Sequence, residues 1–460
     1  MTGARRFGKR SLVIVEPGAP KPALSRDFRL LWSADFSSQL GNAVQFVALP
    51  LIAATVFGAG PLEMGLLAAA GTVPNLVIGL PAGVWVDRLR RRPLLRWTER
   101  GQALVLASVP LAWWAEMLTM AQLYVVAVLS GTLFTLFEVA SQSYLPALVG
   151  RRLLPDANSR LQTTRQVIQF SGRPLGGLLA QILGATNAVV VCVLGFVGST
   201  TLLGRIRDEE VPPERARGGR LSVEVAAGLR FLFQHWLLRP TSLCVTVHNF
   251  FLNVYVAVSV LFLVRDLQLP EGVVGLLISV TGAGGILGGL TVRRWATRFG
   301  KVRALILIMV VTTPFRLLVP FADTGWALSL FVLGVLGGGY GTIAFQVLAV
   351  SLRQTVCPDD LLGRVNASAR FLTWGVIPLG SLAGGALGEL VGLRPTMWVA
   401  GVGMVLSTSF LLVAPMRLLR EAPEEFVGQE LRRDAVEEDR PGTSDDNSPQ
   451  GPAGNPRPVS

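Results

Sequence analysis

Charged residues are scarce in this sequence. Asp, Glu, Lys and Arg make up 16% of its 460 residues, whereas a soluble domain carries about a quarter. A chain with so few charges cannot cover a large water-facing surface, and its hydrophobic content of 51% agrees with that. The composition excludes an ordinary soluble protein and indicates a membrane protein.

Residues that bind metals or form disulfides are also few. Three cysteines (Cys192, Cys244 and Cys357) and two histidines (His235 and His248) are spread along the chain without zinc-ligand spacing. The glycine clusters complete no dinucleotide-binding motif, and no P-loop lysine accompanies them. We therefore expect no metal and no cofactor, and the sequence predicts a protein that is not an enzyme.

The net charge of +12 does not indicate nucleic acid. The basic residues lie between apolar runs and do not form one soluble face. Their placement is typical of membrane topology signals and of contacts to anionic membrane lipid. We expect lipid and no nucleic acid among the partners.

Long uncharged runs fill most of the chain. A membrane-spanning helix needs about 20 mostly apolar residues, and seven runs of that length contain no Asp, Glu, Lys or Arg. These runs are 36–62, 64–86, 174–204, 240–264, 272–292, 324–352 and 395–416. Allowing isolated charges gives twelve predicted spans, near 30–57, 64–86, 94–114, 119–144, 160–183, 186–204, 240–264, 272–292, 303–321, 326–350, 366–388 and 395–415. The predicted fold class is an all-α polytopic membrane protein.

Arginine placement predicts the orientation of these spans. The loop after the second span and the segment 205–239 are rich in arginine, whereas the loops near 58–63, 115–118, 184–187 and 322–325 contain no Lys or Arg. The positive-inside rule then puts both termini in the cytoplasm. The predicted organisation is a cytoplasmic tail (1–27), a six-helix bundle (28–204), a cytoplasmic linker with a short amphipathic helix (205–239), a second six-helix bundle (240–416) and a disordered cytoplasmic tail (417–460).

The two bundles repeat each other. An offset of 208 residues places Gly176-Gly177 on Gly384-Gly385, and an offset of 210 places Gly65-Leu66-Leu67 on Gly275-Leu276-Leu277. A nearly constant offset through several spans indicates two pseudo-repeats around a central cavity. Transporters with this plan rock one half against the other.

The loop after the second span carries a specific motif, Gly83-Val-Trp-Val-Asp87-Arg88-Leu-Arg-Arg91-Arg92. It resembles the cytoplasmic Gly-x-x-x-Asp-Arg-x-x-Arg-Arg signature of the major facilitator superfamily. The resemblance implies a gating role, in which Asp87 pairs with arginine across the interface between the halves and the pair breaks during transport. The alternative is a plain positive-inside loop. The second half has Thr297 in place of Asp87, so any such lock is asymmetric.

Over residues 26–416 the chain resembles the macrolide-efflux and enterobactin-exporter branch of that superfamily. The resemblance rests on Ser38-Gln39-Leu40-Gly41, on the stretch from Phe137 to Leu148 and on the stretch from Asn366 to Gly385. It implies proton-driven export of drugs or siderophores across the cell membrane, and hence multidrug resistance. Two features depart from the related drug antiporters: residues 119–137 lack an arginine, and the fifth span reads Gly172-Arg-Pro-Leu-Gly-Gly177.

Charges inside the spans are independent pointers to function, because each is costly in a bilayer unless it is paired or hydrated. Six residues qualify: Asp35, Glu138, Arg165, Arg173, Arg316 and Arg370. Glu138 and Arg165 fall at similar depths on successive spans. They are interpreted first as a structural ion pair, and second as a proton carrier with its regulator. Asp35 is a further candidate for proton coupling.

Polar side chains in the spans are candidates for the wall of the cavity. Asp35 begins a stripe at three- and four-residue spacing that predicts a face turned toward the cavity. The candidates are Gln39, Asn42, Gln45, Arg173, His248, Asn249, Asn253, Gln346, Arg370 and Trp374. Arg173 either attracts an anionic substrate or belongs to a fixed charge pair, and the sequence leaves both open. His248 is interpreted as a packing residue ahead of a proton relay.

These observations favour a secondary active transporter that exports an amphipathic small molecule in exchange for protons, as a monomer. Uptake or facilitated diffusion by the same fold is the nearest alternative, and a membrane scaffold without transport is a second. A membrane-embedded transferase is a third, but it would need paired acidic metal ligands, and Asp359-Asp360 is an isolated pair.

Overall fold

The computed structural model describes residues 25–79, 86, 89–207, 221–413 and 419. Within these residues the chain is almost entirely helical and contains no strand. The all-helical fold predicted from the apolar runs is therefore confirmed.

The first half of the chain supplies α1 (Arg26–Thr55), α2 (Pro61–Val77), α4 (Arg91–Trp114), α5 (Met120–Leu183) and α6 (Ala185–Gly204). Ser25 caps α1, because its hydroxyl accepts a hydrogen bond from the Phe28 backbone N–H at 3.1 Å. The helix α5 is two antiparallel spans in one. Its direction changes at Gly150, whose φ of 70° lies in the left-handed region open to glycine.

The second half begins with α7 (Leu221–Gln234) and continues with α8 (Leu238–Leu261), which ends in a π-helical turn (Phe262–Asp266). Next come α9 (Glu271–Phe299), α10 (Lys301–Thr312) and a 3-10 helix (Thr313–Phe321). The short 3-10 helix Gly325–Ala327 leads into α11 (Leu328–Val356). The half ends with α12 (Asp359–Val391), α13 (Leu393–Ser407) and α14 (Ser409–Val413).

Eight helical segments in the described residues are long and apolar enough to cross a membrane. Of the other long helices, α1, α4 and the part of α5 after Gly150 are more polar, and α2 is shorter, with 17 residues. All four pack in the same bundles, which is consistent with twelve spans. One local prediction was wrong. Residues 145–159, which fall between two predicted spans and were expected to form a loop, are helical on both sides of Gly150.

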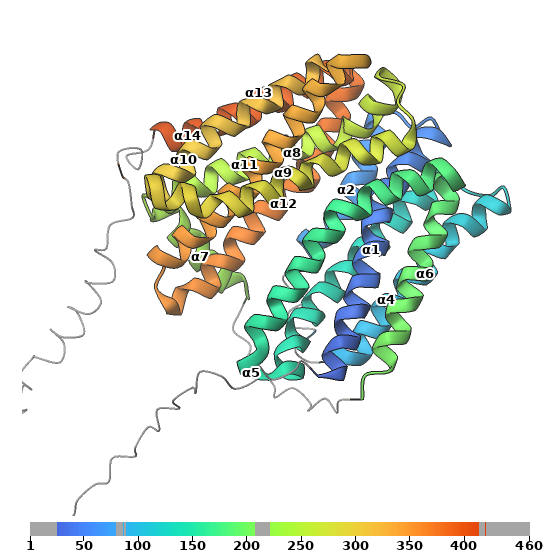
Figure 1. Ribbon diagram of the computed structural model, residues 1–460, viewed down its shortest axis with the longest axis horizontal. Coiled ribbons are helices and arrows are strands. Elements are labelled where there is room, and N and C mark those ends of the chain that lie inside the picture. The colour runs from blue at the N-terminus through green and yellow to red at the C-terminus, as the bar shows by residue number, and fades with distance from the viewer. Residues whose placement is uncertain (1–24, 80–85, 87–88, 208–220, 414–418, 420–460) are drawn as a thin grey trace, which may run out of the picture.

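The two bundles meet along α2, α5, α9 and α12 and spread apart toward the end that carries α7 (Figure 1). We call the end that contains the loops at Ala59, Gly184, Gln268 and Gly392 the closed end. One apolar core joins both halves there, with Met64 of the first half and Val258 of the second among its buried residues. Toward the opposite end the core divides into two clusters, and each belongs to one half only.

Glycines bring the helix backbones of the two halves together at the closed end. A Cβ on Gly65 of α2 would lie 2.7 Å from the Cα of Gly385 on α12, and a Cβ on Gly177 of α5 would lie 2.7 Å from the Cα of Gly275 on α9. A hydrogen bond also crosses between the halves there, because Arg265 Nη2 donates to the Ala59 carbonyl oxygen at 2.6 Å.

Candidate functional site

A cavity of about 580 Å3 lies between the two halves, and residues from both of them line it. The first half contributes residues of α1, α2 and α5, and the second half contributes residues of α8, α9, α11, α12 and the 3-10 helix Thr313–Phe321. The aromatic wall residues are Phe46, Phe134, Tyr255 and Phe331. The uncharged polar wall residues are Asn42, Gln45, Thr72, Asn75, Ser130, Asn253, Ser259, Thr281, Thr342 and Ser381. A wall of this mixed type suits an amphipathic ligand of small size.

The charged residues of the cavity wall are two arginines. Arg173 comes from α5, and its guanidinium lies 4.6 Å from the centre of the Phe46 ring. Arg316 comes from the 3-10 helix of the other half and lies 5.0 Å from the centre of the Tyr255 ring. The described lining residues include no Asp and no Glu. The cavity wall is therefore positively charged.

Four of the predicted cavity residues, Asn42, Gln45, Arg173 and Asn253, line this cavity. The other six lie outside its walls. Gln39 contacts Glu138. His248 is buried, and neither of its ring nitrogens has a hydrogen-bond partner in the described part of the chain. Arg370 stacks on Trp374 with the guanidinium 4.4 Å from the ring centre. Asn249 is half-buried and Gln346 is exposed. Each lies one helical turn from a lining residue, Asn253 or Thr342, on the same face of its helix but beyond the end of the cavity wall.

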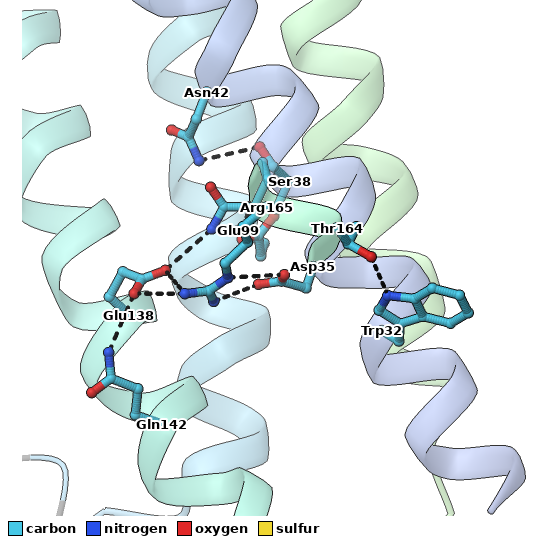
Figure 2. A network of polar contacts seen from close by, with 10 residues as sticks. Trp32, Asp35, Ser38, Asn42, Glu99, Glu138, Gln142, Thr164 and Arg165 are labelled. Carbon is cyan, nitrogen blue, oxygen red and sulfur yellow. Dashed lines mark hydrogen bonds and ion pairs between the residues drawn. The ribbon is translucent and has the colours of Figure 1, made fainter. Parts of the chain in front are cut away.

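A cluster of acidic residues and one arginine lies beside the cavity in the first half (Figure 2). Arg165 donates two hydrogen bonds to Asp35, from Nη2 to Oδ1 at 2.7 Å and from Nε to Oδ2 at 3.2 Å. Its Nη1 lies 3.1 Å from Glu138 Oε1. Gln39 donates to the same Glu138 carboxylate at 3.1 Å. We call Asp35, Glu99, Glu138 and Arg165 the acid–arginine cluster.

The spacing along α1 explains why this cluster forms next to the cavity. Asp35 and Asn42 are seven residues apart, which is about two turns, so they lie on one face of the helix. Asp35 is fully buried and Asn42 lines the cavity. Between them Asn42 donates to the Ser38 carbonyl oxygen at 3.1 Å. The cluster is thus about 10 Å along the helix axis from the cavity wall.

Sequence reasoning missed Glu99 of α4. Its side chain is 1% exposed, and the Ser38 hydroxyl donates to Oε1 at 2.8 Å (Figure 2). Oε2 has no hydrogen-bond donor among the described residues. The residue stands in a run of charges, Arg96-Trp-Thr-Glu99-Arg100, which resembles a helix end at the membrane surface. Helical spacing could have distinguished it, because Glu99 shares a helix face with Thr98 and Gln102, and this face of α4 is buried.

Two of the five predicted gating residues, Arg91 and Arg92, lie in the described part of the chain. Gly83, Asp87 and Arg88 lie outside the described residues. Arg91 and Arg92 begin α4, and Arg92 Nη2 donates to the Gly204 carbonyl oxygen at 3.1 Å. This contact stays within the first half.

Comparison with known proteins relates the whole arrangement to transporters. Residues 19–440 match the protein family described as "transmembrane secretion effector". The chain is 28% identical over 389 residues to the multidrug efflux pump Tap of Mycolicibacterium fortuitum, which covers 82% of this chain and 93% of that protein. It is 25% identical over 383 residues to the uncharacterized MFS-type transporter YfiS of Bacillus subtilis, which covers 80% of this chain and 88% of that protein.

Solved structures show the same fold at low sequence identity. The nucleoside transporter NupG, as a D323A mutant, superposes with a TM-score of 0.71 at 13% identity and covers 85% of this chain and 100% of its own. A bacterial homologue of the iron transporter ferroportin, in an inward-facing state, superposes with a TM-score of 0.65 at 16% identity. It covers 85% of this chain and 99% of its own.

Proposed function

The chain belongs to the transmembrane secretion effector family of the major facilitator superfamily and is a multi-pass membrane transporter, and from this premise we propose that it exports an amphipathic small molecule in exchange for protons. It works by alternating access in the plasma membrane, as a monomer with both termini in the cytoplasm. It moves its cargo without changing it chemically.

The observation that carries this proposal is the difference between the two ends of the cavity. At the closed end the backbones of α2 and α12, and of α5 and α9, are in direct contact, and one core joins the halves. The arginines at the start of α4 and near the end of α9 lie at the opposite end, so the positive-inside rule assigns the closed end to the outside. The molecule is then in an inward-facing state, in which an exporter loads its cargo from the cytoplasm.

The acid–arginine cluster provides a place for proton exchange. Arg165 bridges Asp35 and Glu138, and the Glu138 side chain is 19% exposed whereas that of Asp35 is fully buried. A proton on Glu138 would remove its attraction to Arg165, and the bidentate contact to Asp35 would remain. Glu138 is therefore the proposed site of proton exchange, Asp35 holds Arg165 in position, and Asn42 connects the cluster to the cavity along α1.

The gate at the cytoplasmic end is assigned to Gly83, Asp87, Arg88, Arg91 and Arg92, on the strength of their motif. Breaking an ion pair there, while the glycine contacts at the closed end form, would be one half of the alternating cycle. Export as the direction is supported by the likeness to Tap, a multidrug efflux pump, along most of both chains.

The test is accumulation of a panel of dyes, macrolides and siderophores in cells with and without the protein. Accumulation should be lower with the protein, and an uncoupler of the proton gradient should abolish the difference. Equal accumulation of every compound would remove the transport proposal, and efflux that survives the uncoupler would remove proton coupling.

Glu138→Gln tests the proposed proton site within the same assay. Gln keeps the size of the side chain and removes its charge, so gradient-driven efflux should fall at least about tenfold. Glu116→Gln is the matched control, because Glu116 is an exposed acid between α4 and α5. Efflux by Glu138→Gln that equals efflux by Glu116→Gln would show that the proton is exchanged elsewhere.

A further inference from the structure

The cavity wall contains an unbalanced positive charge. Arg173 and Arg316 approach it from opposite halves, and no Asp or Glu lines it in the described part of the chain. Neither arginine is in an ion pair in these residues, where the ion pairs are those of Arg165 with Asp35 and Glu138. Both guanidinium groups rest on aromatic rings, Phe46 and Tyr255, which attract a cation but leave it its full charge.

Arg316 is built into the fold. Its side chain is 3% exposed, and a Cβ on Gly338 of α11 would overlap its Nε atom. The glycine therefore leaves the space that the guanidinium occupies. Nε and Nη1 have no hydrogen-bond partner among the described residues. A buried guanidinium with free donors is costly, because burial removes its hydration and the contact with Tyr255 replaces only part of it.

Arg173 is linked to the contact between the halves. Its carbonyl oxygen would lie 2.9 Å from a Cβ on Gly275, so its backbone is part of the contact between α5 and α9 at the closed end. The Arg173 backbone lies about one helical turn from Gly177, which touches the second half. Cargo bound to Arg173 would therefore contact α5, the helix that must separate from α9 when the closed end opens.

We propose that the cargo is an amphipathic anion, whose carboxylate, sulfonate or phosphate group pairs with Arg173 and Arg316 while its apolar part lies against Phe46, Phe134 and Tyr255. This inference rests on the proposed transport function and specifies the chemical class of the cargo. An anionic group supplies the counter-charge and the hydrogen-bond acceptors that the wall lacks, and planar guanidinium groups bind such groups through two parallel hydrogen bonds. The amides of Asn42 and Asn253 each donate one N–H to a backbone carbonyl of their own helix, and the second N–H of each is a further donor for the cargo.

The experiment compares two dyes with the same ring system and opposite charge. Fluorescein is anionic and rhodamine 123 is cationic, and binding of each to the purified full chain in lipid nanodiscs is measured by fluorescence anisotropy. The wild type should bind fluorescein at least about tenfold more tightly than rhodamine 123, because hydrogen bonds to a charged group contribute that much. Arg173→Gln and Arg316→Gln should each weaken fluorescein binding about tenfold or more and leave rhodamine 123 binding equal or tighter.

Arg370→Gln is the matched control, because Arg370 also stacks on an aromatic ring but lies outside the cavity. It should leave the binding of both dyes unchanged. Arg173→Lys and Arg316→Lys keep the charge and should recover part of the fluorescein affinity, which separates a charge effect from misfolding. Tighter binding of rhodamine 123, no binding of fluorescein, or fluorescein binding that survives both glutamine variants would overturn the inference.

Transport is read separately, as gradient-driven dye uptake into inside-out vesicles. Uptake of rhodamine 123 in preference to fluorescein would overturn the anionic cargo while the export proposal stands. Fluorescein that binds with the expected arginine dependence but is not moved by the gradient would support the anion site and refute the proposed export.

Discussion

A methyl group at the closed end should shift the balance between the two states of the cavity. In Gly385→Ala the new Cβ would lie 2.8 Å from the Pro61 carbonyl oxygen and 2.9 Å from the Gly65 Cα, both in the other half. Ordinary contacts between such atoms begin near 3.5 Å, so α2 and α12 must separate by roughly 0.7 Å. Overpacking of this kind costs about 1–3 kcal/mol, which changes an equilibrium between two states about 5- to 150-fold.

The assay is the reaction of a cysteine in the cavity with a membrane-impermeant thiol reagent. Asn253→Cys places the thiol on the cavity wall, and the native Cys192, Cys244 and Cys357 are buried. In cells, where the reagent arrives from outside, Gly385→Ala should raise the labelling rate of Cys at position 253 at least about fivefold. In inside-out vesicles the same substitution should lower the rate.

Gly363→Ala is the control on the same helix. A Cβ at Gly363 meets nothing within 4 Å, so this variant adds the same methyl group to α12 without touching the other half. It should label like the parent in both preparations. If Gly385→Ala also labels like the parent, or labels faster only from the cytoplasmic side, then the glycine contact does not hold the outer end closed.

Three further predictions concern the first half, and each is read as the thermal unfolding midpoint in detergent. Asp35→Asn removes the bidentate partner of Arg165 and should lower stability by up to about 3–5 kcal/mol, and a midpoint equal to that of the wild type would contradict the pairing. Glu99→Gln removes one negative charge from a cluster with three carboxyl groups and one guanidinium, and it keeps a partner for the Ser38 hydroxyl. Its midpoint should therefore not fall, and a loss of several degrees would show that the charge of Glu99 is needed. Phe196→Ala empties a fully buried site against Gly41 and should cost about 3–5 kcal/mol, whereas an unchanged midpoint would mean that the site collapses.

Helix positions could be predicted from the sequence because membrane spans are long, apolar and uncharged. The predicted run 186–204 falls on α6, and the predicted run 272–292 falls within α9. The exceptions have a local cause. Around Gly150 the chain stays helical through a charged turn, because a single residue in the left-handed region reverses the chain without a loop.

Residues of the candidate site could be predicted only where their spacing along one helix places them on the same face. The stripe from Asp35 to Gln45 follows from helical period, and the structure turns Asn42 and Gln45 to the cavity. Pairing between helices cannot be obtained that way. Asp35 and Arg165 are 130 residues apart, and nothing in the sequence selects Asp35 over other acids as the bidentate partner. The absence of a counter-charge near Arg316 is likewise a property of packing, because it depends on which helices surround the 3-10 segment.

The two halves have equivalent glycine contacts at the closed end, but their charged residues are not equivalent. The offsets of 210 and 208 exchange the pair Gly65–Gly385 with the pair Gly275–Gly177, so the closed end is held by two equivalent contacts. The offset of 208 carries Arg173 to Ser381, and both line the cavity, but one is charged and the other is not. It carries Glu138 to Gln346, which cannot exchange a proton at physiological pH. If the two halves rock against each other, equivalent contacts are needed in both halves. Coupling to protons needs only one titrating site. On this basis we expect Glu138 of the first half to exchange the proton, and we expect Arg316 of the second half to bind the proposed anionic cargo.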